Sequence, residues 1–368
     1  MAVKELLALA SVPGIGARRV AWIRERFGSV EAAMRVSPAQ LAEAARVGEA
    51  LLQPAGWPAR LEEAERELAR LKAFGGWALG VDEPGYPELL RCISDPPPVL
   101  FGLGDPGCLG EISVAVVGTR RATAYGLEAT RRIAGGLGRS GVVTVSGLAY
   151  GIDGEAHRAA LAAGGKTVAV LGSGLRHVYP SENRPLAERM TRTGAVVSEH
   201  PLDTKPRPGH FPARNRVISG LSRCVVVVES EERGGAMITA DCALEQGREV
   251  MAVPGPITSR FSRGPNSLIK QGATVVTEAA DILEAISWGD GGRSVAAAGR
   301  PARDIRGLLG PDAELVYRSL TGLPTGPDEI IQATSLDPSA VAAALGALEV
   351  EGLIRRAPGP SYMRLAED

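Results

Sequence analysis

One short stretch of the sequence combines an aromatic ring with several fixed positive charges. The hexapeptide Phe211-Pro-Ala-Arg-Asn-Arg216 follows Lys205, Arg207 and His210 and precedes Arg223. The ring can stack on a nucleobase while the guanidinium groups bind phosphates, and the surrounding Pro and Gly residues predict a loop. This combination indicates a site for a single nucleic-acid strand. The alternative is a capping loop whose arginines pair with nearby carboxylates.

Small-residue turns after predicted strands offer a phosphate site to accompany the hexapeptide. The first is Gly118-Thr119-Arg120, the second contains Ser146 and Gly147, and the third is Gly172-Ser-Gly174. Backbone N–H groups in such turns approach an anion closely, and the dipole of the following helix adds to the attraction. Arg120 adds a guanidinium group. The alternative is that these glycines only make tight turns.

Six short apolar runs rich in valine alternate with helical patterns in the middle of the chain. Runs that are apolar throughout are typical of parallel strands buried on both faces. Their alternation with helices predicts a doubly wound, Rossmann-like α/β domain with a parallel sheet. Ligands of such sheets bind beyond the carboxyl ends of the strands, where the three turns lie. The expected strands are 112–117, 142–145, 167–171, 195–198, 225–228 and 250–253, and the expected helices are 124–139, 153–163, 182–193, 213–221 and 236–247.

The sequence shows no convincing nucleotide fingerprint or catalytic constellation. None of the strand-end turns continues into G-x-G-x-x-G, and G-x-x-x-x-G-K-[ST] is absent, which argues against dinucleotide binding and phosphoryl transfer. Asp153 and His157 are explained by a helix N-cap and a side chain one turn later. Ser146 lacks the G-x-S-x-G frame, and no further metal ligand stands near His157. We therefore expect no enzyme activity, no cofactor and no metal.

The composition is that of a globular protein with two or three domains. The chain has 368 residues, of which 45% are hydrophobic and 23% charged, and its four cysteines form no CxxC pair. We therefore expect reduced thiols and a cytoplasmic protein. The net charge is −1, but residues 111–287 carry 21 basic and 17 acidic side chains, while both flanking segments are acidic. A positive central segment agrees with an anionic ligand.

Helical modules are expected at both ends of the chain. Val12-Pro-Gly-Ile-Gly16 separates two helical stretches, the pattern of a helix-hairpin-helix module or of an ordinary αα-hairpin. Near the other end, three helices and a hairpin predict a winged helix. Its third helix, 340–352, contains no basic residue, which favours a protein-interaction or regulatory role over base reading. The expected boundaries are 1–80 for the N-terminal module, 81–288 for the core, 289–303 for a Gly/Ala/Arg linker and 304–368 for the winged helix.

Further motifs run in order through residues 80–285. They are Tyr86-Pro-Glu-Leu-Leu90, Asp95-Pro-Pro97, Val116-Val-Gly-Thr-Arg120, Ser146-Gly-Leu-Ala-Tyr-Gly-Ile-Asp153, Tyr179-Pro180, Ser198-Glu199, the hexapeptide, Glu245-Gln-Gly-Arg248, Pro254-Gly255 and Lys270-Gln-Gly-Ala273. With these motifs the chain resembles the DNA-processing protein A (DprA/Smf) family. The resemblance implies a single-stranded-DNA-binding recombination mediator that protects incoming DNA in natural transformation. It also implies loading of the RecA recombinase and an extended Rossmann-like core that forms a homodimer.

The resemblance also implies roles for individual residues. Arg120 would hold a phosphate, Phe211 would stack on a base, and Arg214 and Asn215 would line the pocket. The basic residue that the family places shortly before the phenylalanine corresponds to Arg207 or Lys205. The expected binding residues are Gly118, Thr119, Arg120, Ser146, Gly147, Lys205, Arg207, Phe211, Arg214, Asn215 and Lys270. At Gly234-Gly235 the chain departs from the polar sequence of many members.

An enzyme of the nucleotide-processing Rossmann-like proteins is the alternative function. A phosphoribohydrolase would bind a nucleoside monophosphate at the glycine turns and use Glu199 or Glu229 as its catalytic carboxylate. The two functions differ in ligand length, because a mediator prefers an oligonucleotide and the enzyme binds and cleaves a monomer. The basic stretch around Phe211 extends past one phosphate and favours the mediator. A third, weaker interpretation is an assembly scaffold whose core binds no ligand.

Overall fold

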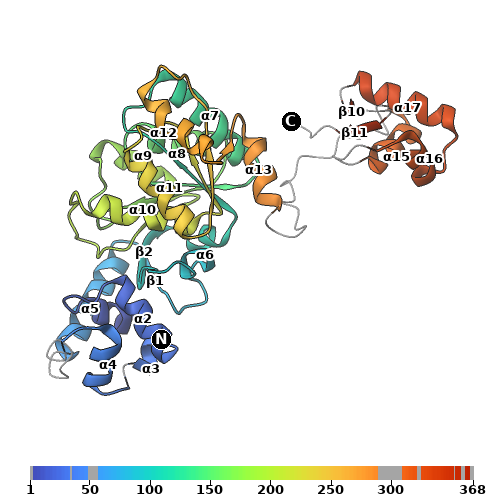
Figure 1. Cartoon of the computed structure of the whole chain (residues 1–368). Helices are drawn as coiled ribbons and strands as arrows, with labels where there is room; N and C mark the ends of the chain where they lie inside the picture. Colours follow the sequence, from blue (N-terminus) through green and yellow to red (C-terminus); the bar gives the residue numbers. More distant parts are fainter. Residues whose placement is uncertain are drawn as a thin grey trace. The chain divides into compact units, whose positions relative to one another are not determined.

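The computed structural model describes residues 3–33, 35–48, 57–288, 309–320, 325–351, 353–357 and 361–364, and the expected linker 289–303 lies outside them. The chain divides into two compact units, Met1–Ala297 and Ala298–Asp368 (Figure 1). The first unit contains both the expected N-terminal module and the expected α/β core. Among the described residues, no helix has the length and apolarity needed to cross a membrane.

A nine-stranded sheet is the centre of the first unit. Its strand order is β1-β2-β6-β5-β4-β3-β7-β8-β9, with β1 and β2 antiparallel to their neighbours and the strands from β6 to β9 parallel. The six expected strands are present within one residue of their expected bounds, and β1, β2 and β9 are additional. The strands are β1 Trp77–Gly80, β2 Val99–Gly104, β3 Ser113–Val117, β4 Val143–Ser146, β5 Thr167–Leu171, β6 Ala195–Ser198, β7 Cys224–Val227, β8 Glu249–Ala252 and β9 Thr274–Val275.

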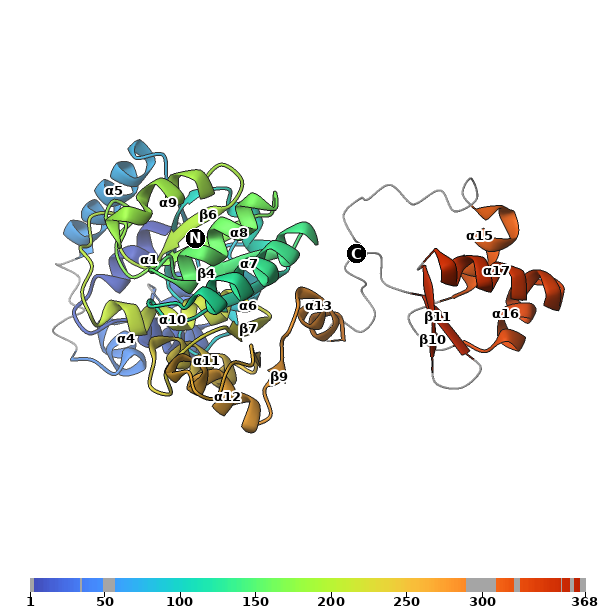
Figure 2. The same cartoon turned by 90° about the horizontal axis from the view of Figure 1, so that it is seen from above.

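Helices cover both faces of the sheet because successive side chains of each buried strand point to opposite faces. In β3, Val114 and Val116 belong to the core beneath α7, α8 and α13, whereas Ala115 and Val117 belong to the core beneath α10, α11 and α12. Figure 2 shows these helices around the strands. Their bounds are α6 Glu88–Arg91, α7 Ala124–Arg139, α8 Ile152–Ala162, α9 Arg184–Met190, α10 His210–Leu221, α11 Gly235–Glu245, α12 Arg263–Lys270 and α13 Ala279–Trp288.

The strand order places a topological switch point between β3 and β7. From β3 the chain proceeds outward through β4, β5 and β6, and it then returns to β7 on the other side and continues through β8 and β9. Open α/β sheets bind their ligands at such a point, outside the carboxyl ends of the two strands. The Gly118-Thr119-Arg120 turn follows β3 directly, so the fold brings it to this position.

The N-terminal helices pack on the antiparallel edge of the sheet and share its core. Leu6 and Leu9 of α1 and Leu71 of α5 belong to the same buried cluster as Leu100 and Phe101 of β2. The expected hairpin 12–16 is present between α1 and α2. The helices are α1 Val3–Ala10, α2 Ala17–Phe27, α3 Val30–Ala33, α4 Pro38–Ala45 and α5 Trp57–Ala73.

The second unit has the expected winged-helix layout. Among its described residues, three helices and a two-stranded antiparallel sheet enclose a small core that includes Val316, Ile330 and Leu348. The exposed positions of α17 are occupied by small residues such as Ala342, Ala343 and Gly346. The expected turn 358–360 lies outside the described residues. The elements are α15 Pro311–Ser319, α16 Pro327–Thr334, α17 Pro338–Val350, β10 Ile354–Ala357 and β11 Ser361–Arg364.

Candidate nucleic-acid interface

A cavity of about 700 Å³ opens at the switch point, and we call it the strand-end cleft. One wall is the Gly118–Arg121 turn after β3. The opposite wall comes from the first turns of α10 and from the start of α11, where Gly234 and Gly235 leave the backbone accessible. Its lining includes Gly118, Thr119, Arg120, Arg121, Tyr179, Pro208, Phe211, Arg214, Asn215, Ser230, Gly234, Gly235 and Phe261.

Arg120 and Phe211 meet in the wall of this cleft. The Arg120 guanidinium carbon lies 5.5 Å from the centroid of the Phe211 ring, within the range of a cation–π contact. Arg120 is exposed, and no carboxylate pairs with it in the part of the chain that the structure describes. A positive charge and an aromatic face are therefore available side by side.

The hexapeptide forms the first turns of helix α10, and our expectation of a loop there was wrong. The helix begins at His210, three residues before the expected start. Pro212 is compatible with this position because the first turn of a helix leaves its N–H groups without intrahelical partners. The helix directs Phe211 toward the cleft and buries Arg214 one turn later, with only 4% of its surface exposed.

Arg214 is held by backbone carbonyl groups and feels the charge of the buried Asp153 carboxylate. Its Nη1 donates to the carbonyl oxygens of Gly147, at 2.9 Å, and Val170. Burial lowers the pKa of Arg214 to about 10, and burial raises the pKa of Asp153, whose carboxylate accepts the Gly147 N–H at 3.1 Å. The N-cap of α8 is Gly151, so our expectation that Asp153 caps this helix was wrong. Asp153 and Arg214 together fix the turn at Gly147.

Three of the expected residues shape the site through contacts within the protein. Ser146 is fully buried and donates its hydroxyl to the Val116 carbonyl at 2.7 Å. Asn215 donates to the Gly235 carbonyl at 3.1 Å and so ties α10 to the start of α11. Gly118 has no room for a side chain, because a Cβ there would lie 2.4 Å from Ile152.

Thr119 lies in the cleft wall and Gly147 lies beside the cleft, and backbone groups of both residues make hydrogen bonds. The Thr119 N–H donates to the Glu229 carbonyl at 2.7 Å. Gly147 lines a smaller hollow beside the cleft, together with Arg120 and Phe211. This hollow extends the open surface from the cleft toward the end of β4.

Besides Arg120, three lysine and arginine contacts were expected outside the hexapeptide, and they are not all near the cleft. Lys205 and Arg207 are exposed on the segment that leads into α10, and Pro208 of that segment lines the cleft. Lys270 is the last residue of α12, which begins after the carboxyl end of β8 and ends before β9. Because β8 and β9 are parallel, the end of α12 lies toward the amino ends of the strands, away from their carboxyl ends where the cleft opens. The structure therefore does not bring Lys270 to the other expected residues.

Two tyrosines at this surface were missing from the expected site. Tyr179 lies with its ring centroid 5.5 Å from that of Phe211, and its side chain is 45% exposed. Tyr150 is exposed to a similar degree and lines the smaller hollow with Tyr179. Both follow the carboxyl end of a strand, Tyr150 after β4 and Tyr179 after β5. That position was the signal that could have identified them.

The carboxylates of the alternative enzyme are both engaged in the fold. Glu199 pairs with Arg216 at 2.6 Å, and burial raises the pKa of Glu199. Arg216 also pairs with Asp95 at 3.0 Å. Glu229 is 1% exposed and accepts the backbone N–H and the hydroxyl of Thr123, the N-cap of α7. Within the described residues, no group of three or more His, Cys, Asp or Glu side chains is placed to hold a metal ion.

The fold and the site together define an extended Rossmann-like α/β protein with an appended winged helix. Family models match accordingly: DNA recombination-mediator protein A matches residues 77–287, and the DprA winged helix domain matches residues 296–360. The chain belongs to the DNA recombination-mediator protein A family.

Individual relatives agree with this assignment. Protein Smf of Synechocystis is 34% identical over 97% of this chain and 98% of its own length. The crystal structure of DNA processing protein A from Streptococcus pneumoniae superposes with a TM-score of 0.69 at 33% identity, covering 77% of this chain and 98% of that one. DNA processing protein A from Helicobacter pylori, whose structure is described in terms of a single-stranded DNA binding mode, gives a TM-score of 0.53 at 28% identity. That match covers 58% of this chain and 96% of the other.

Proposed function

We propose that this protein binds single-stranded DNA at the strand-end cleft and acts as a recombination mediator. The observation that carries the proposal is the contact between the exposed Arg120 guanidinium and the Phe211 ring in the cleft wall. A strand can place a phosphate on Arg120 and stack the adjoining base on exposed aromatic surface. Neither contact depends on the identity of the base, which suits a protein that must accept any sequence.

The aromatic surface continues beyond Phe211, which supports a ligand longer than one nucleotide. Tyr179 adjoins Phe211, and Tyr150 lines the same hollow. Lys205 and Arg207 add exposed positive charge on the segment that precedes Phe211 and ends at Pro208. The Helicobacter pylori relative, described as binding single-stranded DNA, supports the same ligand class.

The position where a mononucleotide phosphate would be expected is filled by the protein itself. Rossmann-like enzymes bind phosphate at the N-terminus of the helix that follows the first core strand. Here that helix is α7, and the Glu229 carboxylate accepts hydrogen bonds from its N-cap residue, Thr123. A second anion at this position would be repelled. This arrangement favours the mediator over a phosphoribohydrolase.

Membership of the family supports the finer parts of the proposal. We propose that the protein protects incoming DNA and loads the RecA recombinase in natural transformation and homologous recombination. It works in the cytoplasm as a homodimer, through a helical module at 1–80, a DNA-binding core at 81–288 and a winged-helix domain at 304–368 joined by the linker 289–303. The proposed direct contacts are Arg120, Phe211, Lys205 and Arg207, with Arg214 and Asn215 holding the wall.

A titration with ligands of graded length tests the proposal. Fluorescent oligo-dT of increasing length and the four nucleoside monophosphates are compared at one salt concentration, because phosphate binding depends on salt. We expect oligonucleotides to bind far more tightly than monophosphates, and duplex DNA to compete poorly because its base faces are hidden. Tight binding and cleavage of a monophosphate would favour the enzyme, whereas equal competition by duplex would indicate a duplex-binding protein.

A further inference from the structure

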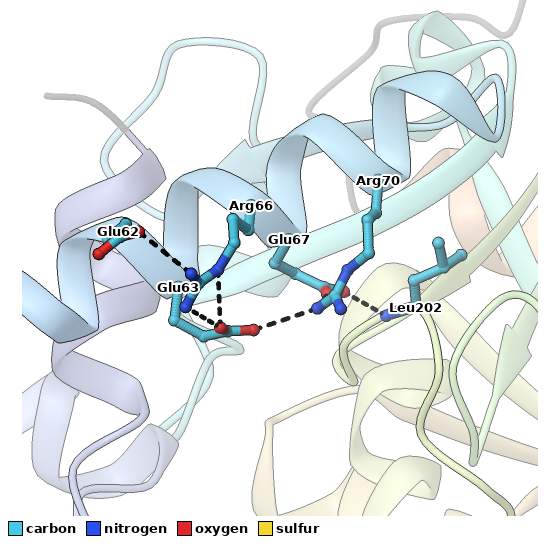
Figure 3. A network of polar contacts seen from close by, with 6 residues as sticks. All are labelled: Glu62, Glu63, Arg66, Glu67, Arg70 and Leu202. Carbon is cyan, nitrogen blue, oxygen red and sulfur yellow. Dashed lines mark hydrogen bonds and ion pairs between the residues drawn. The ribbon is translucent and has the colours of Figure 1, made fainter.

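The segment that carries Lys205 and Arg207 is fastened to the N-terminal module by one buried carboxylate. This segment, residues 199–209 between β6 and α10, is here called the basic loop. Glu67 of α5 is 5% exposed, and its Oε1 accepts the backbone N–H of Leu202 at 2.6 Å (Figure 3). Its Oε2 accepts a hydrogen bond from Arg70. One carboxylate thus joins two regions of the chain that are 135 residues apart.

The turn that follows β5, residues 172–176 and here called the β5 turn, holds the other side of the basic loop. Arg176 donates its N–H to the Leu202 carbonyl at 3.2 Å, and Gly174 donates to the Thr204 carbonyl at 2.8 Å. The two backbones are in direct contact, since a Cβ on Gly174 would lie 2.1 Å from the Pro201 carbonyl oxygen. Leu202 itself is fully buried. The first half of the basic loop is therefore clamped between α5 and the end of the sheet.

The second half of the basic loop reaches the strand-end cleft from this clamp. Lys205 directly follows Thr204, the last residue of the basic loop that is bonded to the β5 turn. The Arg207 carbonyl accepts the His210 N–H at the start of α10. Pro206 and Pro208 restrict the backbone on either side of Arg207. Lys205 and Arg207 are only three and five residues from Leu202. Because so short a segment spans a limited distance, a shift of the backbone at Leu202 also moves both basic side chains.

We propose that Glu67 is a positioning residue for the DNA site, which holds the basic loop so that Lys205 and Arg207 face the strand. The inference rests on the proposed function of the cleft. A buried N–H needs an acceptor, and α5 supplies the one for Leu202. The N-terminal module therefore contributes to DNA binding through the loop that it holds, without having to contact DNA itself.

The conservative variants of Glu67 separate this role from ordinary stabilisation of the fold. Glu67→Gln keeps an oxygen acceptor for the Leu202 N–H and loses only the charge beside Arg70. Glu67→Asp keeps the charge and withdraws the acceptor by one methylene. Glu67→Leu removes the acceptor altogether. Glu63→Ala is the matched control, because Glu63 lies on the same helix and pairs with Arg66 and Arg70, whereas Figure 3 draws no hydrogen bond between Glu63 and Leu202.

The experiment measures oligo-dT affinity of the full-length protein at several salt concentrations. We expect Glu67→Leu and Glu67→Asp to bind about tenfold more weakly, as if two exposed charge contacts were lost. The slope of log K against log salt should become shallower by about 1.4, because each phosphate contact of a single strand contributes about 0.7. Glu67→Gln and Glu63→Ala should keep the affinity and slope of the parent. If Glu67→Leu does not fold, Glu67→Asp must show both effects.

A double-mutant cycle decides whether the effect passes through the basic loop. In a Lys205→Ala/Arg207→Ala background, Glu67→Leu should cause no further loss, since the contacts that it positions are already absent. Equal losses in both backgrounds, or parental affinity and slope for Glu67→Leu, would overturn the inference. If the loop double variant binds like the parent while Arg120→Ala is weakened, Lys205 and Arg207 are no DNA contacts. This inference then fails, whereas the strand-end cleft remains the binding site. If none of these variants weakens binding, the proposed function fails.

Discussion

The buried carboxylate of Glu229 accepts two hydrogen bonds from Thr123, one from its N–H at 2.9 Å and one from its hydroxyl at 2.6 Å. Thr123 is the N-cap of α7, so a side chain of the protein completes the helix N-terminus at the switch point. A carboxylate is stabilised by the helix dipole at this end. The fold thus has the architecture of a nucleotide-binding domain, but the Glu229 carboxylate occupies the helix N-terminus at which such domains bind a phosphate.

Replacing Glu229 should affect stability more than DNA binding. In Glu229→Gln, the amide group places a donor opposite one of the two Thr123 donors, so one hydrogen bond is lost in a buried position. We expect the free energy of unfolding to fall by about 1–3 kcal/mol, measured by urea denaturation. Oligo-dT affinity should stay near that of the parent, because the Glu229 side chain does not line the cleft. Glu232→Gln, on the exposed surface nearby, is the control and should leave stability unchanged.

Arg120 and Phe211 should contribute to binding in ways that salt distinguishes. Arg120→Ala should lose about 2 kcal/mol, roughly 30-fold in affinity, and its salt slope should become shallower by about 0.7. Phe211→Ala should lose about 1–3 kcal/mol of stacking with the slope unchanged. Fluorescence titration of oligo-dT from low to high salt measures both quantities.

The matched control for Arg120 is Arg132→Ala, which removes the same charge from the exposed surface of α7 outside the cleft. It should change affinity little. If the folded Arg120 and Phe211 variants bind a long oligo-dT as tightly as the parent, the strand-end cleft is not the binding site.

Tyr179 should extend the stacking surface beside Phe211. In Tyr179→Ala, affinity for a long oligonucleotide should fall by about 1–3 kcal/mol, because an exposed aromatic face is removed. Tyr179→Phe keeps that face and should bind like the parent. The comparison is made by the same titration, and equal affinity for the Ala and Phe variants would exclude stacking at this position.

His157 should make the protein less stable in acid. Its Nδ1 donates to Thr167 Oγ1 at 2.6 Å, because the Thr167 hydroxyl already donates to the Thr144 carbonyl. Its Nε2 has no hydrogen-bond partner among the residues that the structure describes. Burial lowers the pKa of His157 from 6.5 to about 3. Between these values the unfolded chain binds a proton that the folded chain does not, so His157 stabilises the fold above pH 6.5 and this contribution is lost as the pH falls toward 3.

The variant His157→Asn checks this dependence. Asn places a donor near the Nδ1 position but has no group that titrates in this range. The variant should lose about 1.4 kcal/mol less per pH unit than the parent between pH 6 and 4. Urea denaturation at a series of pH values measures the difference. Parallel curves for the two proteins would show that His157 does not titrate as stated.

The parallel part of the fold could be predicted because its strands are buried on both faces. Each of the six valine-rich runs corresponds to a strand, and the turn after β3 lies at the switch point. The antiparallel edge was missed for a specific reason. Gly102 in the middle of β2 suggests a turn in the sequence, but it stands opposite Trp77 of β1, and a Cβ there would lie 2.1 Å from the Trp77 ring. The glycine makes room for a side chain on another strand.

The candidate site could be predicted only in part, for a related reason. Residue types identified Arg120 and Phe211, but they do not reveal which charges become buried. Arg214 is buried and donates hydrogen bonds to the carbonyls of Gly147 and Val170. Lys270 is the last residue of α12, at the end of this helix that lies away from the cleft. Both outcomes depend on where helices begin and end. The start of α10 at His210 was missed because Pro212 suggested a loop, although proline is tolerated in the first turn of a helix.

The last prediction is that DNA binding by a homodimer survives removal of the C-terminal unit. One cleft contacts only a few nucleotides, so its affinity should be modest. Two clefts on one dimer, engaged by the same strand, gain from effective concentration. Truncation after Trp288 keeps α13 intact and leaves the core of the second unit, built around residues such as Val316 and Ile330, out of the protein.

Residues 1–288 are therefore expressed alone, their mass is measured by light scattering, and long and short oligonucleotides are titrated. We expect a dimer whose affinity for the long oligonucleotide exceeds that for the short one by more than the larger number of binding positions on the long strand would explain. A monomer, or equal affinity per site for both lengths, would contradict the bivalent arrangement. Loss of all binding by a folded dimer would instead assign the DNA site to the winged helix, although the exposed positions of α17 carry small residues and not the basic side chains that such a site requires.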